Sequence, residues 1–377
     1  MRLSYIEVLR KKYPQLQSPK REKHALGSIA IDNDDALYVV LSVRKNNKET
    51  AWVLLYSADP GGHFTVHELP HSRLSFLEIS TGHNNKSQPP AIGCLVWRKD
   101  HPAKFAEYYD LLVFLPVKKK NQLTLGDPVK VSTDCSGIAI HSGGYSFAAT
   151  TGSKTHVVYV NIPKDDKGNP TYVATIDRAK RRVTARKFLV NAPPNTPDAH
   201  STPVIAADSR RHLHVLAGAH NQSFYYMRST KPDTIDAGWT KPLPQGGGQT
   251  YATLVCDSGN RLHSVYRTHP KLFYQHKAAT ADKWSARTKL VHAPKEHQGY
   301  TIFYHRLFVD RADALYLSFT FFEFHTGEKG RYPRALAVSE DNGQSWRLAT
   351  TETFLRRVVA EKKGEQGTPA DADKPRR

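Results

Sequence analysis

The sequence predicts an all-β fold, and two observations support this prediction. Short apolar runs of strand length dominate the chain, and clusters rich in Gly, Pro, Asn and Asp interrupt them at intervals of about ten residues. Few segments keep a helical period, and Tyr5–Lys12 is the one short helix that we expect. The composition, with 39% hydrophobic and 24% charged residues, is globular and excludes collagen, a coiled coil and general disorder.

The expected strands follow one another along most of the 377 residues. Each is an apolar or alternating run between turn-forming residues. The clearest are Ile29–Val43, Ala51–Tyr56, Ile92–Val96, Tyr109–Val117, Ser146–Thr151, Thr155–Val160, Val183–Val190, Leu315–Phe322 and Ala335–Val338. No apolar run approaches the roughly 18 residues that a membrane-spanning helix needs.

A repeated turn signature organises these strands. In four segments an Asp is followed five residues later by Leu and then by an aromatic residue or His, which predicts a β-hairpin with Asp in its turn. The segments are Asp32–Tyr38, Asp208–His214, Asp257–His263 and Asp310–Tyr316. The last three begin 49 and 53 residues apart, a period that predicts roughly seven four-stranded propeller blades over this length. The alternative is four unrelated hairpins in a β-sandwich.

A second motif supports the propeller. Ser339–Trp346 fits the Asp-box pattern S-x-D-x-G-x-x-W, in which Asp caps a tight turn and Gly takes a positive φ. Ser229–Asp233 followed by Trp239 is a relaxed version. We therefore predict one β-propeller over residues 25–358, preceded by an extension or closing segment at 1–24. Residues 359–377 are charged, have almost no apolar content and are expected to be a disordered tail.

Charge and motif content narrow the choice of partner. Lys and Arg number 54 against 35 Asp and Glu, so the net charge is +19 and the expected partner is a polyanion. The sequence has no zinc-finger or RNP motif, no Walker loop, no His-Glu-x-x-His and no Gly-x-Ser-x-Gly. The candidate polyanions are nucleic acid, an anionic membrane and an acidic polysaccharide, and the oligomeric state stays open. Three cysteines exclude a disulfide framework.

The candidate catalytic residues are His200, His220, Tyr251 and Arg267. His200 and His220 bracket the hairpin around Asp208, and Tyr251 and Arg267 bracket the next hairpin, around Asp257. Because the start of one strand and the end of its antiparallel partner lie side by side, each pair should meet. Neighbouring blades should then bring both pairs to one end of the propeller.

The stretch from His200 to Arg267 resembles the propeller polysaccharide lyases with BNR repeats, the ulvan lyases in particular. The resemblance rests on DAHSTPVIAADSRRHLHVLAGAHNQSFYYMRS and TYATLVCDSGNRLHSVYR. It implies a seven-bladed propeller that cleaves a sulfated, uronate-containing algal polysaccharide by β-elimination. The implied partner is therefore an acidic polysaccharide, and neither nucleic acid nor a membrane. It also implies that the two catalytic His, the Tyr and the Arg of these enzymes correspond to the four residues above. Some members hold a structural zinc through His and Cys; here the candidate ligands are His269 and His276, with no Cys nearby.

β-Elimination accounts for these residue types without a cofactor. The C5 proton of a uronate becomes acidic only when the charge on the adjacent carboxylate is neutralised, a task for Arg267. A His or Tyr can take the proton, and a Tyr or His can return one to the leaving O4 oxygen. Whether His200 or Tyr251 is the base stays open. Candidate substrate contacts are Asn221, Arg228, Tyr300, Tyr304, His305 and Arg306; on an alternating strand Tyr304 and Arg306 would share a face and His305 the opposite one.

Two other functions compete with the lyase. A non-catalytic propeller that binds an acidic glycan or another polyanion would keep the charge and the blades. A sialidase-like hydrolase would need an Arg triad and a Tyr nucleophile with a Glu partner, but Glu is scarce in the expected strands. The substrate class predicts a secreted or periplasmic protein, although the N-terminal residues show no signal peptide and a cytoplasmic location stays open.

Overall fold

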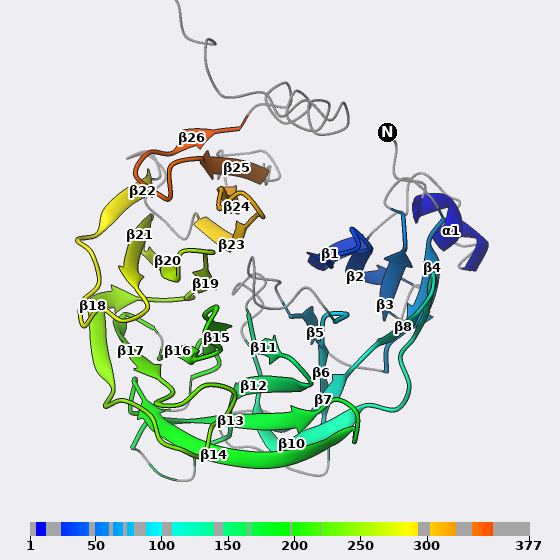
Figure 1. The fold of residues 1–377 in the computed structure, drawn as a ribbon, viewed down its shortest axis with the longest axis horizontal. Helices are drawn as coiled ribbons and strands as arrows, with labels where there is room; N and C mark the ends of the chain where they lie inside the picture. The colour runs from blue at the N-terminus through cyan, green and yellow to red at the C-terminus, as the bar shows by residue number, and fades with distance from the viewer. Residues whose placement is uncertain are drawn as a thin grey trace, which may run out of the picture.

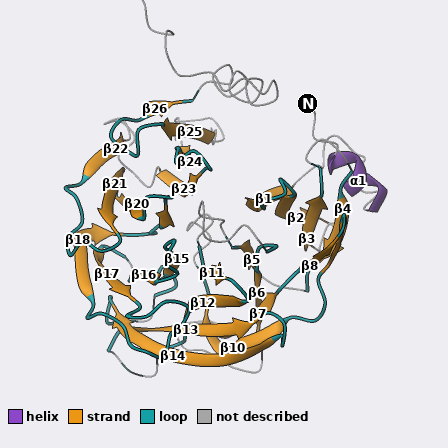
Figure 2. Cartoon of the chain, viewed as in Figure 1, coloured by secondary structure: helices purple, strands orange, loops and turns teal. Residues whose placement is uncertain are grey.

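A computed structural model describes most of the chain. The described residues are 5–12, 24–44, 50–59, 63–70, 74–78, 88–99, 108–138, 146–163, 165, 167–196, 198–218, 220–292, 302–321 and 334–349. Apart from α1 (Tyr5–Lys12), they consist of strands and the turns between them (Figure 2). The helix lies where the sequence predicts it. No described helix is long and apolar enough to cross a membrane.

Six four-stranded antiparallel sheets, called blades one to six, stand around a common centre (Figure 1). Blade one is β1 (His24–Ile31), β2 (Leu37–Arg44), β3 (Thr50–Ser57) and β4 (Thr65–Glu68). Blade two is β5 (Leu74–Leu77), β6 (Ile92–Trp97), β7 (Tyr108–Phe114) and β10 (Val129–Ser136). Blade three is β11 (Ala148–Thr151), β12 (Lys154–Val160), β13 (Asn169–Asp177) and β14 (Arg182–Ala192).

The remaining blades repeat this plan. Blade four is β15 (Val204–Ala207), β16 (Leu213–Ala217), β17 (Gln222–Arg228) and β18 (Leu243–Gln249). Blade five is β19 (Val255–Cys256), β20 (Arg261–Thr268), β21 (Lys271–Ala278) and β22 (Thr288–His292). Blade six is β23 (Ile302–Val309), β24 (Leu315–Phe321), β25 (Arg334–Ser339) and β26 (Arg347–Leu348). In each blade the first strand is the innermost (Figure 1). The prediction of an all-β propeller is therefore confirmed.

The number of blades differs from the sequence prediction: the described residues form six rather than seven. The interval of 176 residues from Asp32 to Asp208 holds only two blades, blades two and three, between the two Asp turns, whereas a period of about 50 residues leaves room for about three. Blade two is lengthened by an inserted hairpin of β8 (Val117–Lys119) and β9 (Gln122–Thr124) between its last two strands. Blade three is lengthened by β13 and β14, of 9 and 11 residues. A constant period of about 50 residues therefore overestimates the number of units.

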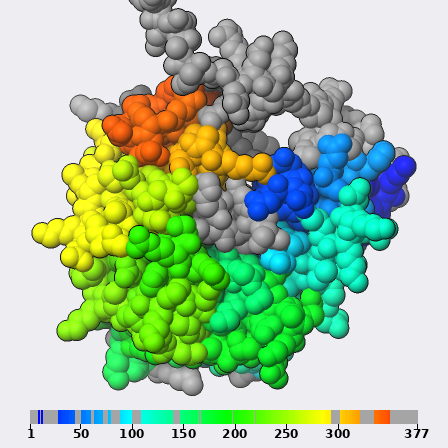
Figure 3. Space-filling model, in the orientation of Figure 1, coloured from blue at the N-terminus to red at the C-terminus, as the bar shows by residue number. Residues whose placement is uncertain are grey.

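The core lies between the blades. One cluster of buried apolar side chains runs from Phe76 of blade two to Tyr266 of blade five, and others join blades one and two, three and four, and five and six. Strands covered by a neighbour on both faces are buried throughout: every residue of β15 and β16 is buried, and all of them are apolar except His214. The outer strand β14 instead alternates, with Arg182, Thr184 and Arg186 exposed. From the cyan to the yellow part of the ring the blades pack tightly (Figure 3).

The four predicted Asp hairpins are confirmed as the first hairpins of blades one, four, five and six. In each turn one carboxylate oxygen accepts backbone N–H groups, as when Asp208 accepts from His212. The other oxygen bonds the residue six positions later, as Asp257 does with the buried His263 at 3.1 Å. This contact explains the aromatic residue or His in the repeat.

The same turns are linked to one another around one face of the propeller. In three of the four turns, the residue after the Asp bonds the residue three positions after the Asp of another turn. The links are Ser209 N to Asn260 Oδ1 (2.7 Å), Ser258 N to Asp313 Oδ1 (2.9 Å) and Arg311 Nη2 to Asp35 Oδ1 (2.6 Å). The last link joins blade six to blade one, which share no strand within the described residues.

We expect the Arg311 link to help close the ring. Arg311 also donates to the backbone carbonyl of Asn33 at 3.1 Å, so Arg311→Ala should lower the free energy of unfolding by about 1 kcal/mol despite the exposure of the ion pair. Denaturant unfolding of Arg311→Ala, Asp35→Ala and the double variant measures their coupling. Lys167→Ala is the matched control, because its ion pair with Asp165 is exposed and local. Equal effects of Arg311→Ala and Lys167→Ala would contradict a closing role.

The Asp-box also folds as its residues predict. Ser339 Oγ lies 2.8 Å from Asp341 Oδ1 and accepts the N–H of Gly343, which has φ 86°. Trp346 packs against the core between blades five and six. A Cβ on Gly343 would lie 1.9 Å from the Tyr274 hydroxyl, so this turn needs glycine for space as well as for its φ.

Candidate active site

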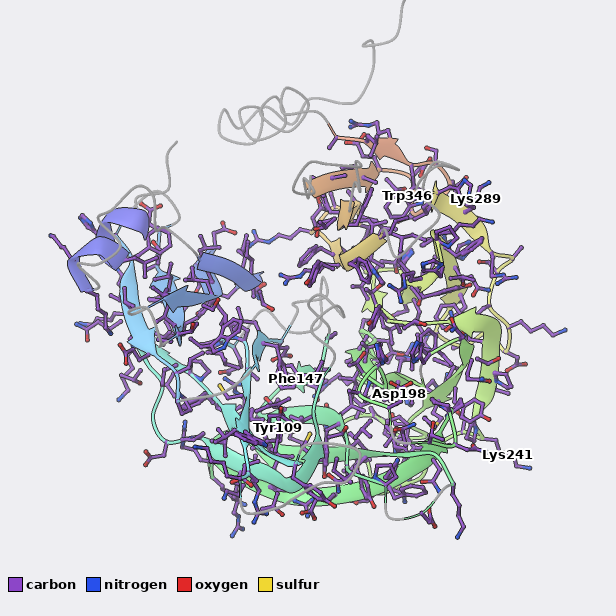
Figure 4. All side chains as sticks on the ribbon, turned by 180° about the vertical axis from the view of Figure 1, so that it is seen from behind. Tyr109, Phe147, Asp198, Lys241, Lys289 and Trp346 are labelled. Carbon is purple, nitrogen blue, oxygen red and sulfur yellow. The ribbon has the colours of Figure 1, made fainter. Side chains whose placement is uncertain are left out.

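The four predicted catalytic residues lie together at one end of blades four and five. His200 precedes β15 and His220 lies in the turn between β16 and β17. Tyr251 precedes β19, and Arg267 is near the end of β20. Asp208 and Asp257 occupy the other ends of the same hairpins, so the candidate site faces away from the linked Asp turns. Asp198, labelled in Figure 4, lies in the loop that connects β14 of blade three to β15 of blade four.

Both histidines bond one carboxylate. His200 Nδ1 lies 2.5 Å from Asp198 Oδ1, and His220 Nδ1 lies 2.9 Å from Asp198 Oδ2. The two imidazole rings are 4.2 Å apart between centroids. Burial acts to raise the pKa of Asp198, but the hydrogen bonds from the side chain and backbone of His200 and the interaction with His220 outweigh it and lower that pKa. Asp198 is therefore an ionised acceptor shared by two imidazoles.

Asp198 is itself held in place by a buried amide. Its backbone N–H donates to Asn169 Oδ1 at 3.0 Å. Asn169 is fully buried at the start of β13, and its Nδ2 donates to the carbonyls of Pro194 and Thr196 at 2.9 and 3.1 Å. The loop that carries His200 is thus anchored to blade three, which fixes the direction of the carboxylate.

Tyr251 and Arg267 form the deeper part of the site. The residue before Tyr251, Thr250, exchanges two backbone hydrogen bonds with Arg267, at 2.8 and 2.9 Å. The Arg267 guanidinium lies 4.8 Å from the ring centre of Tyr251 and the same distance from that of Phe303 in blade six. Tyr251 is 1% exposed and Arg267 3%. The ring of His200 lies 5.6 Å from that of Tyr251, so the two predicted pairs meet. The histidines are more accessible, with side chains 24% and 39% exposed.

His305 holds the backbone of Tyr251 through a hydrogen bond. It is fully buried, and its Nε2 donates to the Tyr251 carbonyl at 2.6 Å. Burial lowers the pKa of His305 to about 4, so the ring is neutral at physiological pH. Tyr251 has φ 57°, a left-handed conformation that is unfavourable outside glycine and asparagine, and His305 bonds the carbonyl of this strained residue. His305 therefore positions Tyr251, whereas the sequence placed it among the substrate contacts.

The other candidate contacts divide by position. Asn221 is exposed beside His220, and both have positive φ angles. Arg228 lies at the far end of β17, roughly 20 Å along the strand from Gln222, and donates to the Ala279 carbonyl. The structure therefore does not bring Arg228 to the site. Tyr300 lies outside the described residues.

Tyr304 and Arg306 are both half-buried on β23, whereas His305 between them is fully buried. This difference in burial is what opposite faces of a strand would give. The reason is not simple alternation, because the pairing with β24 is irregular between Phe303 and Arg306, and Tyr304 has φ 54°.

The two candidate zinc ligands, His269 and His276, lie apart from each other. His269 lies in the turn between β20 and β21, while His276 pairs with His263 along β21.

Two contributors escaped the sequence analysis. Asp198 stands two residues before His200, but only the fold of the loop turns its carboxylate toward both histidines. Phe303 comes from the next blade, and its contact with Arg267 depends on how blades five and six pack. The signal for Asp198 was the sequence Asp-Ala-His, an acceptor at the right distance to bond the following imidazole.

Comparison with known proteins identifies the family. The family model described as "BNR repeat-containing family member" matches residues 153–372, more than half of the chain, so this protein belongs to that family. No curated protein sequence matches the chain.

The solved structures that resemble this chain do so at low sequence identity. An ulvan lyase of polysaccharide lyase family 25, bound to -[GlcA(1-4)Rha3S]-, is 11% identical with a TM-score of 0.45, and the match covers 59% of this chain and 60% of that one. The α-L-arabinanase of Penicillium chrysogenum is 13% identical (TM-score 0.46; 82% and 92% covered). The NanB sialidase of Streptococcus pneumoniae is 12% identical (0.41; 88% and 61%). The chain thus spans about 60% of the ulvan lyase.

Proposed function

We propose that this protein is a polysaccharide lyase that cleaves an acidic, uronate-containing polysaccharide by β-elimination. The observation that carries the proposal is the pair of imidazoles on Asp198, set against Tyr251 and Arg267. These residues supply a base held in a fixed orientation, a phenol and a guanidinium within one cluster. Elimination at a uronate requires these three groups.

The hydrogen bonds of the two imidazoles to Asp198 favour a histidine as the base. An ionised carboxylate can only accept hydrogen bonds, so each Nδ1 must donate to Asp198. A neutral imidazole whose proton is on Nδ1 carries its lone pair on Nε2. His200 and His220 therefore present two basic Nε2 atoms, and one of them takes the C5 proton. His200 is assigned this role because its ring lies beside Tyr251.

Tyr251 and Arg267, which are more deeply buried than the two histidines, supply the acid and the charge stabilisation. As the C5 proton leaves, negative charge spreads onto the uronate carboxylate, and the buried guanidinium stabilises it in surroundings of low polarity. Tyr251 donates its phenolic proton to the glycosidic O4 oxygen as the C4–O4 bond of the uronate breaks, so this oxygen leaves on the neighbouring sugar as a hydroxyl. Phe303 and His305 hold these two groups in place through the contacts described above.

The carboxylate content of the cluster favours elimination over hydrolysis. A glycosidase of the usual kind needs two carboxyl groups on opposite sides of the bond. Among the described residues, the cluster offers one, Asp198, and both of its oxygens are bonded to imidazoles. The excess of positive charge, +19 over the chain, suits a polyanionic substrate such as a sulfated, ulvan-like polysaccharide.

A specific observation keeps a second candidate, a non-catalytic propeller that binds a polyanion. Tyr251 and Arg267 are almost completely buried, and Arg267 is packed against two aromatic rings, as in a purely structural cluster. Such a protein would need only the positive charge and the exposed histidines.

Ultraviolet absorbance separates the two candidates. The purified chain mixed with ulvan should generate the absorbance of an unsaturated uronate, because elimination leaves a C4–C5 double bond conjugated to the carboxylate. His200→Ala should abolish this signal while the protein still folds. Binding of ulvan by the wild-type protein without any such absorbance would favour the binding module.

A further inference from the structure

The cluster of Asp198, His200 and His220 also has the composition of a metal site. The three residues each offer one ligand atom, and these atoms lie within 4.8 Å of one another. We propose that they bind a divalent transition-metal ion of the Zn²⁺ class, and that the bound ion switches off the histidine base. The binding stands independently of the proposed function, whereas the switching rests on it.

The distances suit one ion after a small rearrangement in which each Nδ1 atom moves away from the carboxylate oxygen that it now bonds. A tetrahedral ion with bonds of about 2.1 Å separates its ligand atoms by roughly 3.4 Å. The carboxylate oxygens already lie 2.5 and 2.9 Å from the two Nδ1 atoms, and the rings pack at 4.2 Å. The ion would take the place between these atoms that hydrogen bonds now bridge.

The site is accessible and preorganised. The imidazoles are 24% and 39% exposed and the Asp198 side chain 11%, so an ion can reach them from solvent. The amide of Asn169 fixes the backbone of Asp198, as outer partners do in natural metal sites. The ring of Tyr251 lies next to His200, and the Arg267 guanidinium lies 4.8 Å from the centre of this ring. An aromatic ring therefore lines the side of the cluster that faces the positive charge of Arg267.

The ligand types select the class of ion. Two imidazoles and one carboxylate suit Zn²⁺, Cu²⁺, Ni²⁺ or Co²⁺. Ca²⁺ and Mg²⁺ prefer a shell of oxygen atoms, of which this cluster offers one carboxylate. We therefore expect no competition from Ca²⁺ or Mg²⁺ at equal concentrations.

Coordination and base catalysis exclude each other at these residues. A neutral imidazole that binds an ion through Nδ1 carries its proton on Nε2. The Nε2 lone pair that the proposed elimination uses is then no longer present. The ion also neutralises Asp198, whose charge holds the catalytic tautomer. Metal binding should therefore inhibit the enzyme even when the substrate path is open.

The test measures binding directly on the full chain. Chelator-treated protein is titrated with Zn²⁺ by calorimetry and with Co²⁺ by visible absorption. Wild type should bind one ion of this class, and Asp198→Asn and His220→Gln should weaken the affinity by at least about tenfold. His67→Gln is the matched control: His67 is a half-buried histidine on β4 of blade one, and its loss should change nothing. Circular dichroism and thermal unfolding confirm that each variant is folded.

Unchanged Zn²⁺ affinity in both cluster variants, or absence of a Co²⁺ spectrum in wild type, would overturn the metal site. The activity arm is separate. Binding without any lyase activity in metal-free protein would refute the proposed function and leave the metal site standing. Lyase activity that persists with the ion bound would overturn the switching.

Discussion

Arg267→Lys should reduce kcat by about 10²–10³, although it preserves the positive charge. The guanidinium is planar and lies 4.8 Å from the ring centres of both Tyr251 and Phe303. A lysine ammonium cannot stack in this way, and it is more strongly hydrated, so it would leave the buried position from which charge on the uronate is stabilised. The measurement is the initial rate of unsaturated-uronate formation at saturating substrate.

Arg228→Lys is the matched control for this variant. Arg228 is a partly buried arginine of the neighbouring blade, but it lies at the far end of β17 and should leave kcat unchanged. If Arg267→Lys retains wild-type turnover while remaining folded, the guanidinium has no part in the chemistry.

Tyr251→Phe should lower the rate by about 10²–10⁴, because it removes the phenolic proton and keeps the ring. The ring accounts for the contacts with His200 and Arg267, and the His305 bond is to the backbone, so the packing of the site should survive. Equal thermal stability of the variant and the wild type would verify this. The kinetic loss then reports proton transfer alone.

Tyr225→Phe provides the comparison for a tyrosine outside the cluster. Tyr225 is half-buried on β17, opposite Ala217, and the loss of its hydroxyl should be silent in turnover. Full activity in Tyr251→Phe would remove this phenol from the mechanism and favour the binding module.

Local patterns predicted much of the fold correctly. The Asp of each repeated turn bonds its own backbone and the residue six positions later, so the hairpin is encoded within seven residues. Pairing of His200 with His220 followed from the same hairpin geometry. The number of blades did not follow, since the β8–β9 insertion and the long β13 and β14 carry no signal that separates them from another blade.

Long-range features decided what the sequence could not show. Arg228 was misplaced because the length of β17 carries it to the opposite end of its blade. His305 was placed at the substrate because alternation says which face a residue takes, but not that the neighbouring blade covers it. Asp198 and Phe303 join the site through a loop and through the packing between blades, neither of which is periodic.

The central claim is that the Asp198–His200–His220–Tyr251–Arg267 cluster eliminates rather than hydrolyses. The most direct measurement is a mass spectrum of the products formed from ulvan by the wild-type protein in water enriched in ¹⁸O. Elimination predicts new non-reducing ends that are lighter than hydrolysis products by one water molecule, with no ¹⁸O incorporated at the cleaved bond. Saturated products that carry ¹⁸O would contradict it.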